Sequence, residues 1–217
     1  MNRTLTPLSA QRGAGLATGT AELGGYVVRA AGPADADAIR DFVCGLSVKT
    51  QFLRFFTAVA PPSGGLLRIL SGAKGNADVI LITDERGLVV GHGMAVDLEQ
   101  CGTLSTDVGL VIADRWQGQG LGTTLLSLLT ARATERGVTT LVLDILPTNL
   151  RMLGIITRRW PDAQRTRTAD AISVRADITP RAGSAEQPTT RRSPADHSQA
   201  STDSYRGVRR EPARSAA

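Results

Sequence analysis

The stretch VIADRWQGQGLGTTLL, Val111 to Leu126, places three glycines at alternate positions between an apolar run and a leucine-rich run. The apolar run is typical of a strand, and the leucines recur at helical spacing. A glycine loop that leads from a strand into a helix presents free backbone N–H groups at the positive end of the helix dipole, so it attracts anions. The stretch therefore predicts a phosphate-binding loop, and the rest of the chain decides which phosphate.

Two common nucleotide loops do not fit this pattern. A Rossmann fingerprint needs GxGxxG after the first strand of a βαβ unit and an acid about 20 residues later. Here Gly118, Gly120 and Gly122 form GxGxG, and the nearest acid, Asp144, falls within a predicted strand. A P-loop needs a Lys-Ser/Thr pair after its glycines, and none follows. The sequence thus argues against both.

Length and composition predict one domain. The chain has 217 residues, of which 41% are hydrophobic, enough for a single core. Residues 1–24 and 180–217 contain too few large apolar side chains to offset the entropy cost of ordering. We therefore expect two disordered ends and a folded domain over residues 25–179.

The positive charge is concentrated in the C-terminal segment. The formal net charge is +5, and residues 180–217 hold seven arginines and four acidic residues. The remaining residues are nearly balanced, so a dedicated nucleic-acid surface is not expected. The C-terminal segment alone would give weak, salt-sensitive attraction to polyanions.

No metal site and no membrane span are predicted. Cys44 and Cys101 lack CxxC spacing, and only His92 and His197 are available as further ligands, so both cysteines are expected to be reduced and structural. The chain has neither an apolar run of membrane-spanning length nor a signal-peptide pattern. These features favour a cytoplasmic protein, expected to be a monomer or a dimer.

Apolar spacing along the body predicts a definite order of elements. The order is one strand, two or three helices, three strands, a helix, a strand, a helix and two strands. The corresponding residues are 26–31, 33–46, 48–56, 66–70, 77–83, 88–100, 102–114, 121–136, 139–146, 147–160, 164–168 and 172–177.

The glycine loop and this order together resemble a known family. Residues 117–122, QGQGLG, match the Q/R-x-x-G-x-G/A pattern between an apolar strand and a helix. This resembles the pyrophosphate loop of the GNAT acyltransferase superfamily, which binds acyl-coenzyme A, and the resemblance covers about residues 26–178. It implies an α/β (α+β) fold: a mixed, mostly antiparallel sheet of about six or seven strands, about four helices, and strands splayed at the cofactor cleft.

The resemblance also implies acetyl-CoA as acyl donor and a set of residues that hold it. Small residues let the loop backbone approach the pyrophosphate, and N–H groups from Gln117 to Thr123 can converge on its oxygens. Gly109 is a candidate bulge where the strand splays. Asn149 is either a cofactor contact or a helix cap, and Thr148 could cap instead. The expected cofactor-binding residues are Leu110, Val111, Ile112, Gln117, Gly118, Gln119, Gly120, Leu121, Gly122, Thr123 and Asn149.

Asp107 is the candidate general base. Residues 107–118 are similar to the E-V-A-F-x-V-x-D-x-x-Q-G pattern of bacterial protein-lysine acetyltransferases in this superfamily, with Asp107 at the glutamate position. Residues 38–56, AIRDFVCGLSVKTQFLRFF, resemble the "LS…S…RFF" segment of the same subgroup. Amide formation needs a deprotonated amine. Because aspartate is one methylene shorter, its proton transfer is expected to pass through water; the alternative is a solvated acid.

The sequence departs from the family pattern at the general acid. Many members carry a tyrosine seven residues after the asparagine, where this chain has Ile156. Tyr26 and Tyr205 are too remote in sequence to replace it, so the thiolate is expected to leave unprotonated or to take a proton from solvent. His92 could face the cleft, although a packed structural histidine is the favoured interpretation.

Three further groups have open interpretations. Phe52, Phe55 and Phe56 are expected to pack in the core, with a wall beside the acceptor as the alternative. Trp116 either packs over the cofactor or covers the core. An arginine cluster is either a solvated face or a border of the phosphorylated adenosine or of an acidic partner; it comprises Arg151, Arg158, Arg159, Arg165 and Arg167.

The leading functional hypothesis is an acetyl-CoA-dependent N-acetyltransferase acting on a primary amine. The subgroup resemblance implies a protein lysine as first-choice acceptor, with an acyl-CoA synthetase as one candidate protein. A small-molecule amine is the alternative substrate. The shortened acid and the missing tyrosine also leave open an acyl-CoA-binding regulatory module without catalysis.

Overall fold

The computed structural model describes residues 20–73, 77–100 and 102–179 of the chain. Residues 1–19 and 180–217, which the sequence predicts to be disordered, lie outside the described residues. Residues 20–24 fall in the segment predicted to be disordered, yet they contain strand β1 (Ala21–Leu23), which pairs with β2 (Tyr26–Ala30). The folded part therefore begins before residue 25.

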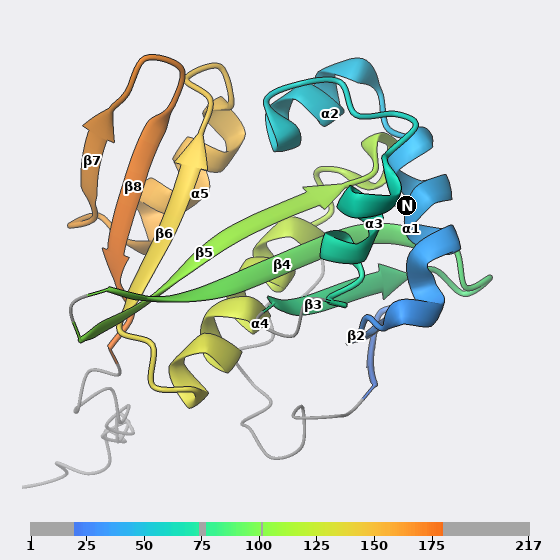
Figure 1. Ribbon diagram of the computed structural model, residues 1–217, viewed down its shortest axis with the longest axis horizontal. Helices are drawn as coiled ribbons and strands as arrows, with labels where there is room; N and C mark the ends of the chain where they lie inside the picture. Colours follow the sequence, from blue (N-terminus) through green and yellow to red (C-terminus); the bar gives the residue numbers. More distant parts are fainter. Residues whose placement is uncertain (1–19, 74–76, 101, 180–217) are drawn as a thin grey trace, which may run out of the picture. The chain divides into compact units, whose positions relative to one another are not determined.

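The strands form one sheet of eight, in the order β1-β2-β3-β4-β5-β6-β8-β7 (Figure 1). All neighbouring pairs are antiparallel except β5 and β6, which are parallel. The predicted mixed, mostly antiparallel sheet is confirmed, with β1 as a strand beyond the predicted six or seven. The other bounds are β3 Ala77–Thr83, β4 Val89–Gln100, β5 Thr103–Ile112, β6 Thr140–Ile145, β7 Gln164–Arg167 and β8 Ile172–Asp177.

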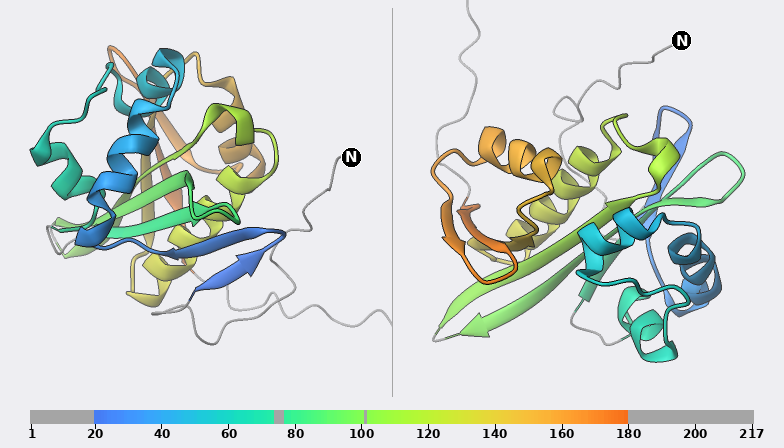
Figure 2. Two further views of the ribbon diagram at one scale, coloured as in Figure 1. Left: turned by 90° about the vertical axis from the view of Figure 1, so that its right-hand side faces the viewer. Right: turned by 90° about the horizontal axis from the view of Figure 1, so that it is seen from above.

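Within the described residues, five α-helices cover the two faces of the sheet (Figure 2). Helices α1, α2 and α3 lie on one face, whereas α4 and α5 lie on the other. Two 3-10 turns, η2 and η3, precede α1 and α4. The bounds are η2 Pro33–Asp35, α1 Ala36–Cys44, α2 Val48–Phe55, α3 Gly64–Leu70, η3 Asp114–Trp116, α4 Leu121–Glu135 and α5 Leu150–Arg159.

Alternation along β5 divides its side chains between two cores. Val108 and Ile112 belong to the larger core under α4, and Val111 belongs to the smaller core under α1 and α3. Because successive strand residues point to opposite faces, Asp107 and Gly109 share the face of Val111. The candidate base therefore lies on the side of the sheet that α2 covers.

The gap at the centre of the sheet begins at Asp107. Strand β5 pairs with β6 only through Ser105↔Thr140, Thr106↔Leu141 and Asp107↔Val142. Beyond this point the two strands part (Figure 1), which confirms the predicted splay. The backbone edge of β5 from Val108 to Ile112 consequently faces no strand.

Gly109 does not form the predicted bulge. Its pairing with Met94 of β4 belongs to a register that runs without a shift along the whole of β5. The structure gives a different reason for the glycine: a Cβ built at this position would overlap the guanidinium of Arg54 on α2. The glycine therefore marks close packing of a helix side chain on the strand, not a change of register.

Candidate active site

Two glycines give the loop its shape. Gly118 (φ 83°) and Gly120 (φ 87°) both adopt the left-handed conformation that other residues rarely take, and Gly120 is the N-cap of α4. A Cβ built on either glycine would meet no atom within 4 Å. Open space therefore lies beside the loop. The two glycines allow its left-handed backbone conformation and leave room for a bound group to come close to the backbone.

The free N–H groups of the loop run from Gly118 to Thr123. The predicted set began at Gln117, but its N–H donates to the carbonyl of Asp114 at 3.2 Å. Within the described residues, the N–H groups of 118–120 donate to no other backbone group, and the first turn of α4 leaves its own N–H groups unpaired. The run of N–H groups without a backbone partner therefore begins one residue later than predicted.

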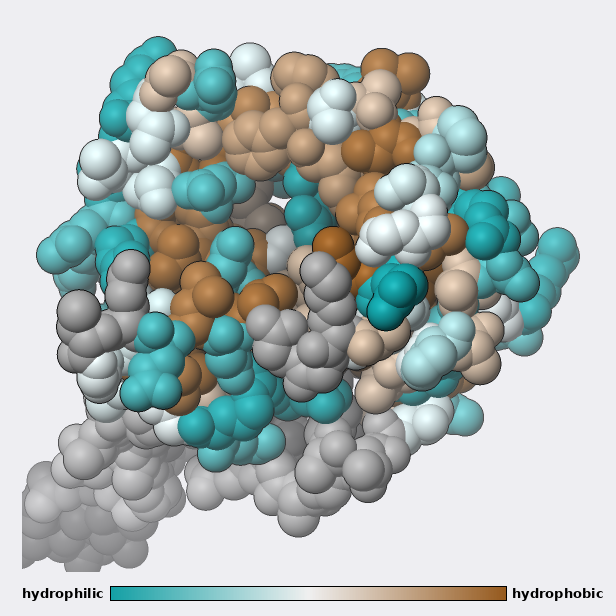
Figure 3. Space-filling model, viewed as in Figure 1, coloured by the Kyte–Doolittle hydropathy of each residue, from teal (hydrophilic) through white to brown (hydrophobic). Residues whose placement is uncertain are grey.

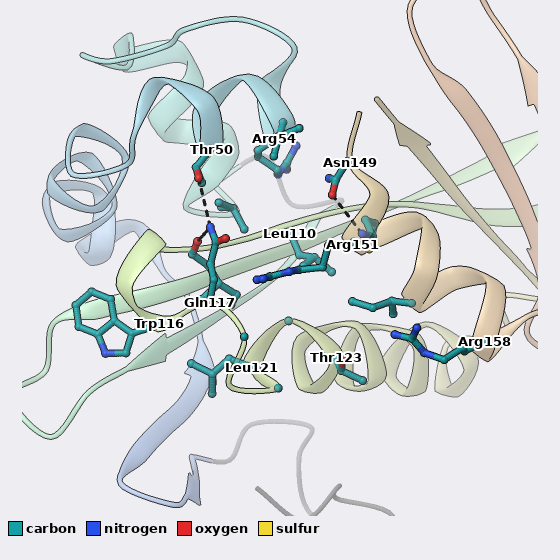
Figure 4. A pocket seen from close by; sticks show the side chains of 18 residues that line it. Thr50, Arg54, Leu110, Trp116, Gln117, Leu121, Thr123, Asn149, Arg151 and Arg158 are labelled. Atoms are coloured by element: carbon teal, nitrogen blue, oxygen red, sulfur yellow. Dashed lines mark hydrogen bonds between the residues drawn. The ribbon is translucent and has the colours of Figure 1, made fainter. Parts of the chain in front are cut away.

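The two glutamines of the loop hold it in place through their side chains. The amide nitrogen of Gln117 donates to the carbonyl of Ile112 at 3.0 Å and to Thr50 Oγ1 at 3.3 Å (Figure 4). Gln119 turns the other way, and its Oε1 accepts a hydrogen bond from the Tyr26 hydroxyl at 2.8 Å. Both side chains position the loop and leave its backbone to meet a ligand.

A cavity of about 330 Å³, here called the loop cavity, opens beside these glycines (Figure 4). Of the eleven residues predicted to bind the cofactor, all but Gln119 line it. None of its lining residues is acidic, whereas three are arginines, so its charge suits a polyanion. The remaining lining residues are Thr50, Leu53, Arg54, Trp116, Arg151, Met152, Ile155 and Arg158.

The predicted arginine cluster divides between two roles. Arg151 and Arg158 line the loop cavity. Arg159 donates to Ser127 Oγ at 2.9 Å and lies over the ring of Trp160, while Arg165 donates to Thr157 Oγ1. Only the first two are in a position to meet an anion in the cavity.

A second cavity of about 310 Å³, here called the aspartate cavity, lies on the α2 side of the gap. Asp107 and Asp144 both line it, so its charge differs from that of the loop cavity. Figure 3 shows a hollow on this face of the molecule, between the part that carries α2 and the part that carries β6. Its other lining residues are Leu53, Arg54, Phe55, Phe56, Met94, Val96, Val108, Gly109, Leu110, Leu143, Ile145, Asn149 and Met152.

The aromatic side chains of α2 only partly follow the core prediction. Phe55 packs against the smaller core, but Phe52 is 49% exposed. Helix α2 ends at Phe55, and Phe56 takes the left-handed conformation (φ 62°), so the three rings do not share a helical face. Phe55 and Phe56 also line the aspartate cavity.

The pKa of Asp107 is raised above that of an ordinary aspartate. Burial is the main cause because it disfavours the charged form, and the negative charge of Asp144 adds to it. The positive charge of Arg54 opposes both. The carboxylate of Asp107 is therefore a stronger base than that of an exposed aspartate.

Five residues line both cavities and so mark where they meet: Leu53, Arg54, Leu110, Asn149 and Met152. Arg54 is the charged member of this set, and burial lowers the pKa of its guanidinium. Arg54 was not among the predicted functional residues. The available signal was its place in the RFF segment, residues 54–56, that resembles the acetyltransferase subgroup.

Asn149 caps α5 and also lines both cavities. Its Oδ1 accepts a hydrogen bond from the Met152 N–H at 3.2 Å, which makes Asn149, not Thr148, the N-cap of α5. Among the described residues its amide nitrogen has no hydrogen-bond partner, and the residue borders both cavities. A cap and a ligand contact are therefore compatible at this position.

Other candidates lie away from the cavities. His92 is 2% exposed, its Nε2 lies 2.9 Å from the carbonyl of Leu70, and burial lowers its pKa to about 4, so it is the packed, neutral histidine that was favoured. Ile156 is fully buried in the larger core. No tyrosine is among the described residues that line either cavity.

Cys44 is free and exposed, so the structural role predicted for it is wrong; Cys101 lies outside the described residues. The part of the chain that the structure describes contains no group of three His, Cys, Asp or Glu side chains able to hold a metal ion. Over the same residues, no helix combines the length and apolar character needed to cross a membrane.

Helix α2 is tied to the turn before the glycine loop through Asp114. This carboxylate accepts hydrogen bonds from the Ser47 N–H (3.0 Å), the Ser47 hydroxyl and the Thr50 hydroxyl (both 2.7 Å). Although burial opposes ionisation, these bonds lower the pKa of Asp114. The helix that carries Arg54 and the loop that precedes α4 are thus held as one unit.

The chain belongs to the GNAT family of acetyltransferases, whose family model matches residues 49–159. That range contains Asp107, the glycine loop and Asn149. The order of elements, the splayed strands and the family match agree with one another, and together they make the protein a transferase of the N-acyltransferase class.

Solved structures of this family share the fold at low sequence identity. The GNAT domain of PAT from S. lividans aligns with a TM-score of 0.62 and 20% identity, covering 70% of this chain and 90% of that one. The ribosomal-protein-S5-alanine acetyltransferase of Vibrio fischeri aligns at 0.57 and 14%, covering 73% and 96%. A phosphinothricin acetyltransferase from Sinorhizobium meliloti, solved with AcCoA, aligns at 0.55 and 20%, covering 76% and 94%. No curated protein sequence matches the chain.

Proposed function

We propose that the protein transfers an acetyl group from acetyl-CoA to a primary amine, with a protein lysine as the first-choice acceptor. The observation that carries the proposal is the meeting of two cavities of different charge where β5 and β6 part. One cavity suits an anionic cofactor and the other suits a cationic amine.

The loop cavity holds the cofactor in this proposal. The pyrophosphate accepts hydrogen bonds from the N–H groups between Gly118 and Thr123, and Arg151 and Arg158 lie near enough to the cavity to pair with further phosphate charge. The pantetheine arm lies along the free edge of β5 at Leu110, Val111 and Ile112, where main-chain groups are available because β6 has turned away. The thioester then reaches the junction of the cavities.

The aspartate cavity takes the acceptor. A lysine side chain is a cation at neutral pH, and Asp107 and Asp144 supply negative charge to attract it. Asp107 removes the amine proton through a water molecule, and its raised pKa makes it a better base for this step. The neutral amine attacks the thioester carbon, and the coenzyme leaves as the thiolate.

The small-molecule alternative differs only in what fills the aspartate cavity. The structural relatives include one whose acceptor is a ribosomal protein and one whose acceptor is phosphinothricin, so the fold is compatible with both classes. Asp107 and Asp144 favour any acceptor with a positive charge. The subgroup resemblance of residues 38–56 and 107–118 is what favours a protein lysine.

Radiolabelled acetyl-CoA, incubated with the protein and a panel of amines, lysine peptides and candidate proteins, tests the proposal. We expect label on lysine, and a loss of about 100-fold or more in rate for Asp107→Ala, the range of general-base catalysis. Asp170→Ala, an exposed aspartate in the turn between β7 and β8, is the matched control and should act as wild type. Acetyl-CoA binding without transfer to any acceptor would instead support the regulatory module.

A further inference from the structure

Arg54 is a charged side chain without an ionic partner. It forms no ion pair and no hydrogen bond with any described residue, and its Nε is buried and unpaired. Its guanidinium carbon lies over the Phe55 ring, 5.0 Å from the ring centroid. Because a buried charge is costly unless it is hydrogen-bonded or paired, such a group calls for an acceptor that binds at the site.

The position of Arg54 identifies where that acceptor lies. The guanidinium packs on Gly109, two residues beyond the last pair between β5 and β6, and it lines both cavities. Figure 4 shows Arg54 descending from α2 on one side of the loop cavity and Asn149 standing at the start of α5 on the other. An electron-rich atom at the junction would lie within reach of the arginine.

The charges around Arg54 argue against a permanent protein partner. Asp107 is the nearby acid that interacts with it electrostatically, but the two do not form an ion pair. Among the described residues that line the loop cavity, none is acidic. The guanidinium is held in place by packing on Gly109 and Phe55, so its donors stay available at the junction.

We propose that Arg54 is a catalytic residue that donates hydrogen bonds to the carbonyl oxygen of the bound thioester and stabilises the oxyanion formed from it. The inference rests on the proposed transfer reaction. The amine nitrogen forms a bond to the carbonyl carbon, and the carbonyl π electrons move onto the oxygen that Arg54 faces. When the carbonyl re-forms, the C–S bond breaks and the thiolate leaves with the electron pair. Asp107 has already taken one proton from the lysine ammonium through water, and the second proton on the nitrogen is released to solvent.

This role of Arg54 explains why a positively charged side chain lies in a site whose proposed acceptor, a lysine ammonium group, is also positively charged. Preorganised donors aimed at the developing charge act most strongly where water is excluded. Arginine offers several N–H groups in a rigid plane and does not lose its proton even when burial lowers its pKa. In the proposed reaction, the acceptor amine enters beside Asp107 and Asp144. It comes close to Arg54 only when it reaches the carbonyl carbon of the thioester.

Steady-state kinetics of Arg54→Met, Arg54→Lys and a control test the proposal. Methionine keeps an apolar stem but removes charge and donors, so we expect kcat to fall about 100-fold to 1,000-fold, the effect of losing an oxyanion donor. The KM for acetyl-CoA and the calorimetric affinity for unacylated CoA should stay near wild type. Lysine should restore part of kcat, since it keeps the charge without the planar fork. Arg68→Met, at an exposed arginine on α3, should match wild type.

Two further measurements separate catalysis from a purely structural role. The thermal midpoint of Arg54→Met should not fall, because the change removes an unpaired buried charge. The acidic limb of its kcat/KM profile should move to higher pH, since Arg54 opposes the effects of burial and Asp144 on the pKa of Asp107.

The inference is overturned if Arg54→Met keeps the kcat of wild type, or if its CoA affinity falls as much as its kcat/KM. It is also overturned if wild type prefers malonyl-CoA to acetyl-CoA and Arg54→Met reverses that preference, since Arg54 would then bind a carboxylate on the acyl group. Absence of transfer by the wild-type protein would overturn the proposed function itself and this inference with it.

Discussion

Asp107 connects the electrostatics of the site to its pH dependence. Its carboxylate is the basic form, so activity is expected to fall as the pH drops through its pKa. Burial and Asp144 raise that pKa, which moves the acidic limb of the profile above the range of an exposed aspartate.

Asp144→Asn should move the acidic limb of kcat/KM to lower pH. The change removes the negative charge that helps to raise the pKa of Asp107, and it leaves burial and Arg54 in place. The measurement is a kcat/KM profile against pH, with Asp170→Asn as the control that should leave the limb unmoved. A limb that stays in place in Asp144→Asn would mean that another group sets it.

Asp107→Asn should stabilise the fold at neutral pH while it slows transfer by about 100-fold or more. A carboxyl whose pKa is higher in the folded state than in the unfolded state binds its proton more tightly when folded. Its contribution is therefore full below the unfolded pKa and is lost as the pH rises through the folded pKa. Thermal unfolding at pH 7 should show a higher midpoint for Asp107→Asn, and the difference should shrink toward acid pH.

At the residue scale, the sequence predicted the groups that belong to local patterns. Asp107 lies within β5 and Asn149 follows β6, both at positions the family pattern marks. Asp107 lines the aspartate cavity, and Asn149 lines both cavities. Arg54 could not be found in this way, because its importance arises from its packing on Gly109, far along the chain. Contacts between distant segments leave no periodic signal in either segment.

At the element scale, the start of α4 combines two features of the glycine loop. Gly120 supplies the left-handed turn that begins the helix, and it leaves open space for a ligand. Gly137, just past the other end of the same helix, has almost the same conformation (φ 85° against 87°) and equally open surroundings. Substituting each of these two glycines by alanine should therefore introduce the same backbone strain, but only the change at Gly120 should also affect a bound ligand.

Gly120→Ala should lower the affinity for acetyl-CoA by about tenfold or more, because its methyl group would stand where the phosphate approaches the backbone. Gly137→Ala should cost a similar amount of stability, roughly 1–2 kcal/mol for a left-handed alanine, without changing the affinity. Calorimetric titration and thermal unfolding of both variants check this. Equal affinities in the two variants would contradict a ligand beside Gly120.

Gly109→Ala should fold and yet lose turnover. The atoms that an added Cβ would overlap are the far end of the Arg54 side chain, which can move at little cost to the fold. The displaced guanidinium would no longer face the junction, so kcat should fall toward that of Arg54→Met, and the double variant should be no slower than Arg54→Met alone. Additive losses in the double variant would show that the two changes act separately.

The sequence predicted the order of elements well because each long element has its own apolar spacing. Strand β1 was missed, since three residues with a single leucine show no alternation. The shared aromatic face of α2 and the bulge at Gly109 were wrong. The three rings do not share a face because α2 ends at Phe55, and β5 keeps its register with β4 through Gly109, on which Arg54 packs. Local patterns do not contain that information.

At the scale of the whole molecule, charge separates the domain from its C-terminal segment. The domain carries a nearly balanced charge, and its cavities supply the local charge that the proposed substrates need. Residues 180–217 supply most of the net +5. The two parts are therefore expected to have separable properties.

Removing residues 180–217 should leave acetyl-CoA affinity, turnover and the thermal midpoint unchanged. Any affinity of the full chain for DNA should be weak, should fall steeply between about 50 and 200 mM salt, and should decrease on truncation. Titration of labelled duplex DNA at several salt concentrations measures this. Equal DNA binding by the truncated protein would place the polyanion surface on the domain.

The junction of the two cavities also bears on the kinetic order of the reaction. In the proposed reaction, the donor and the acceptor occupy separate cavities that share Arg54, Leu110 and Asn149. The described residues that line these cavities include no cysteine or serine that could carry the acetyl group. Both substrates can then be bound at once, and the acetyl group can pass between them in a single ternary complex. Double-reciprocal plots of initial velocity should therefore intersect and not run parallel. CoA can leave through the loop cavity, by which acetyl-CoA entered, and the acetylated amine can leave through the aspartate cavity.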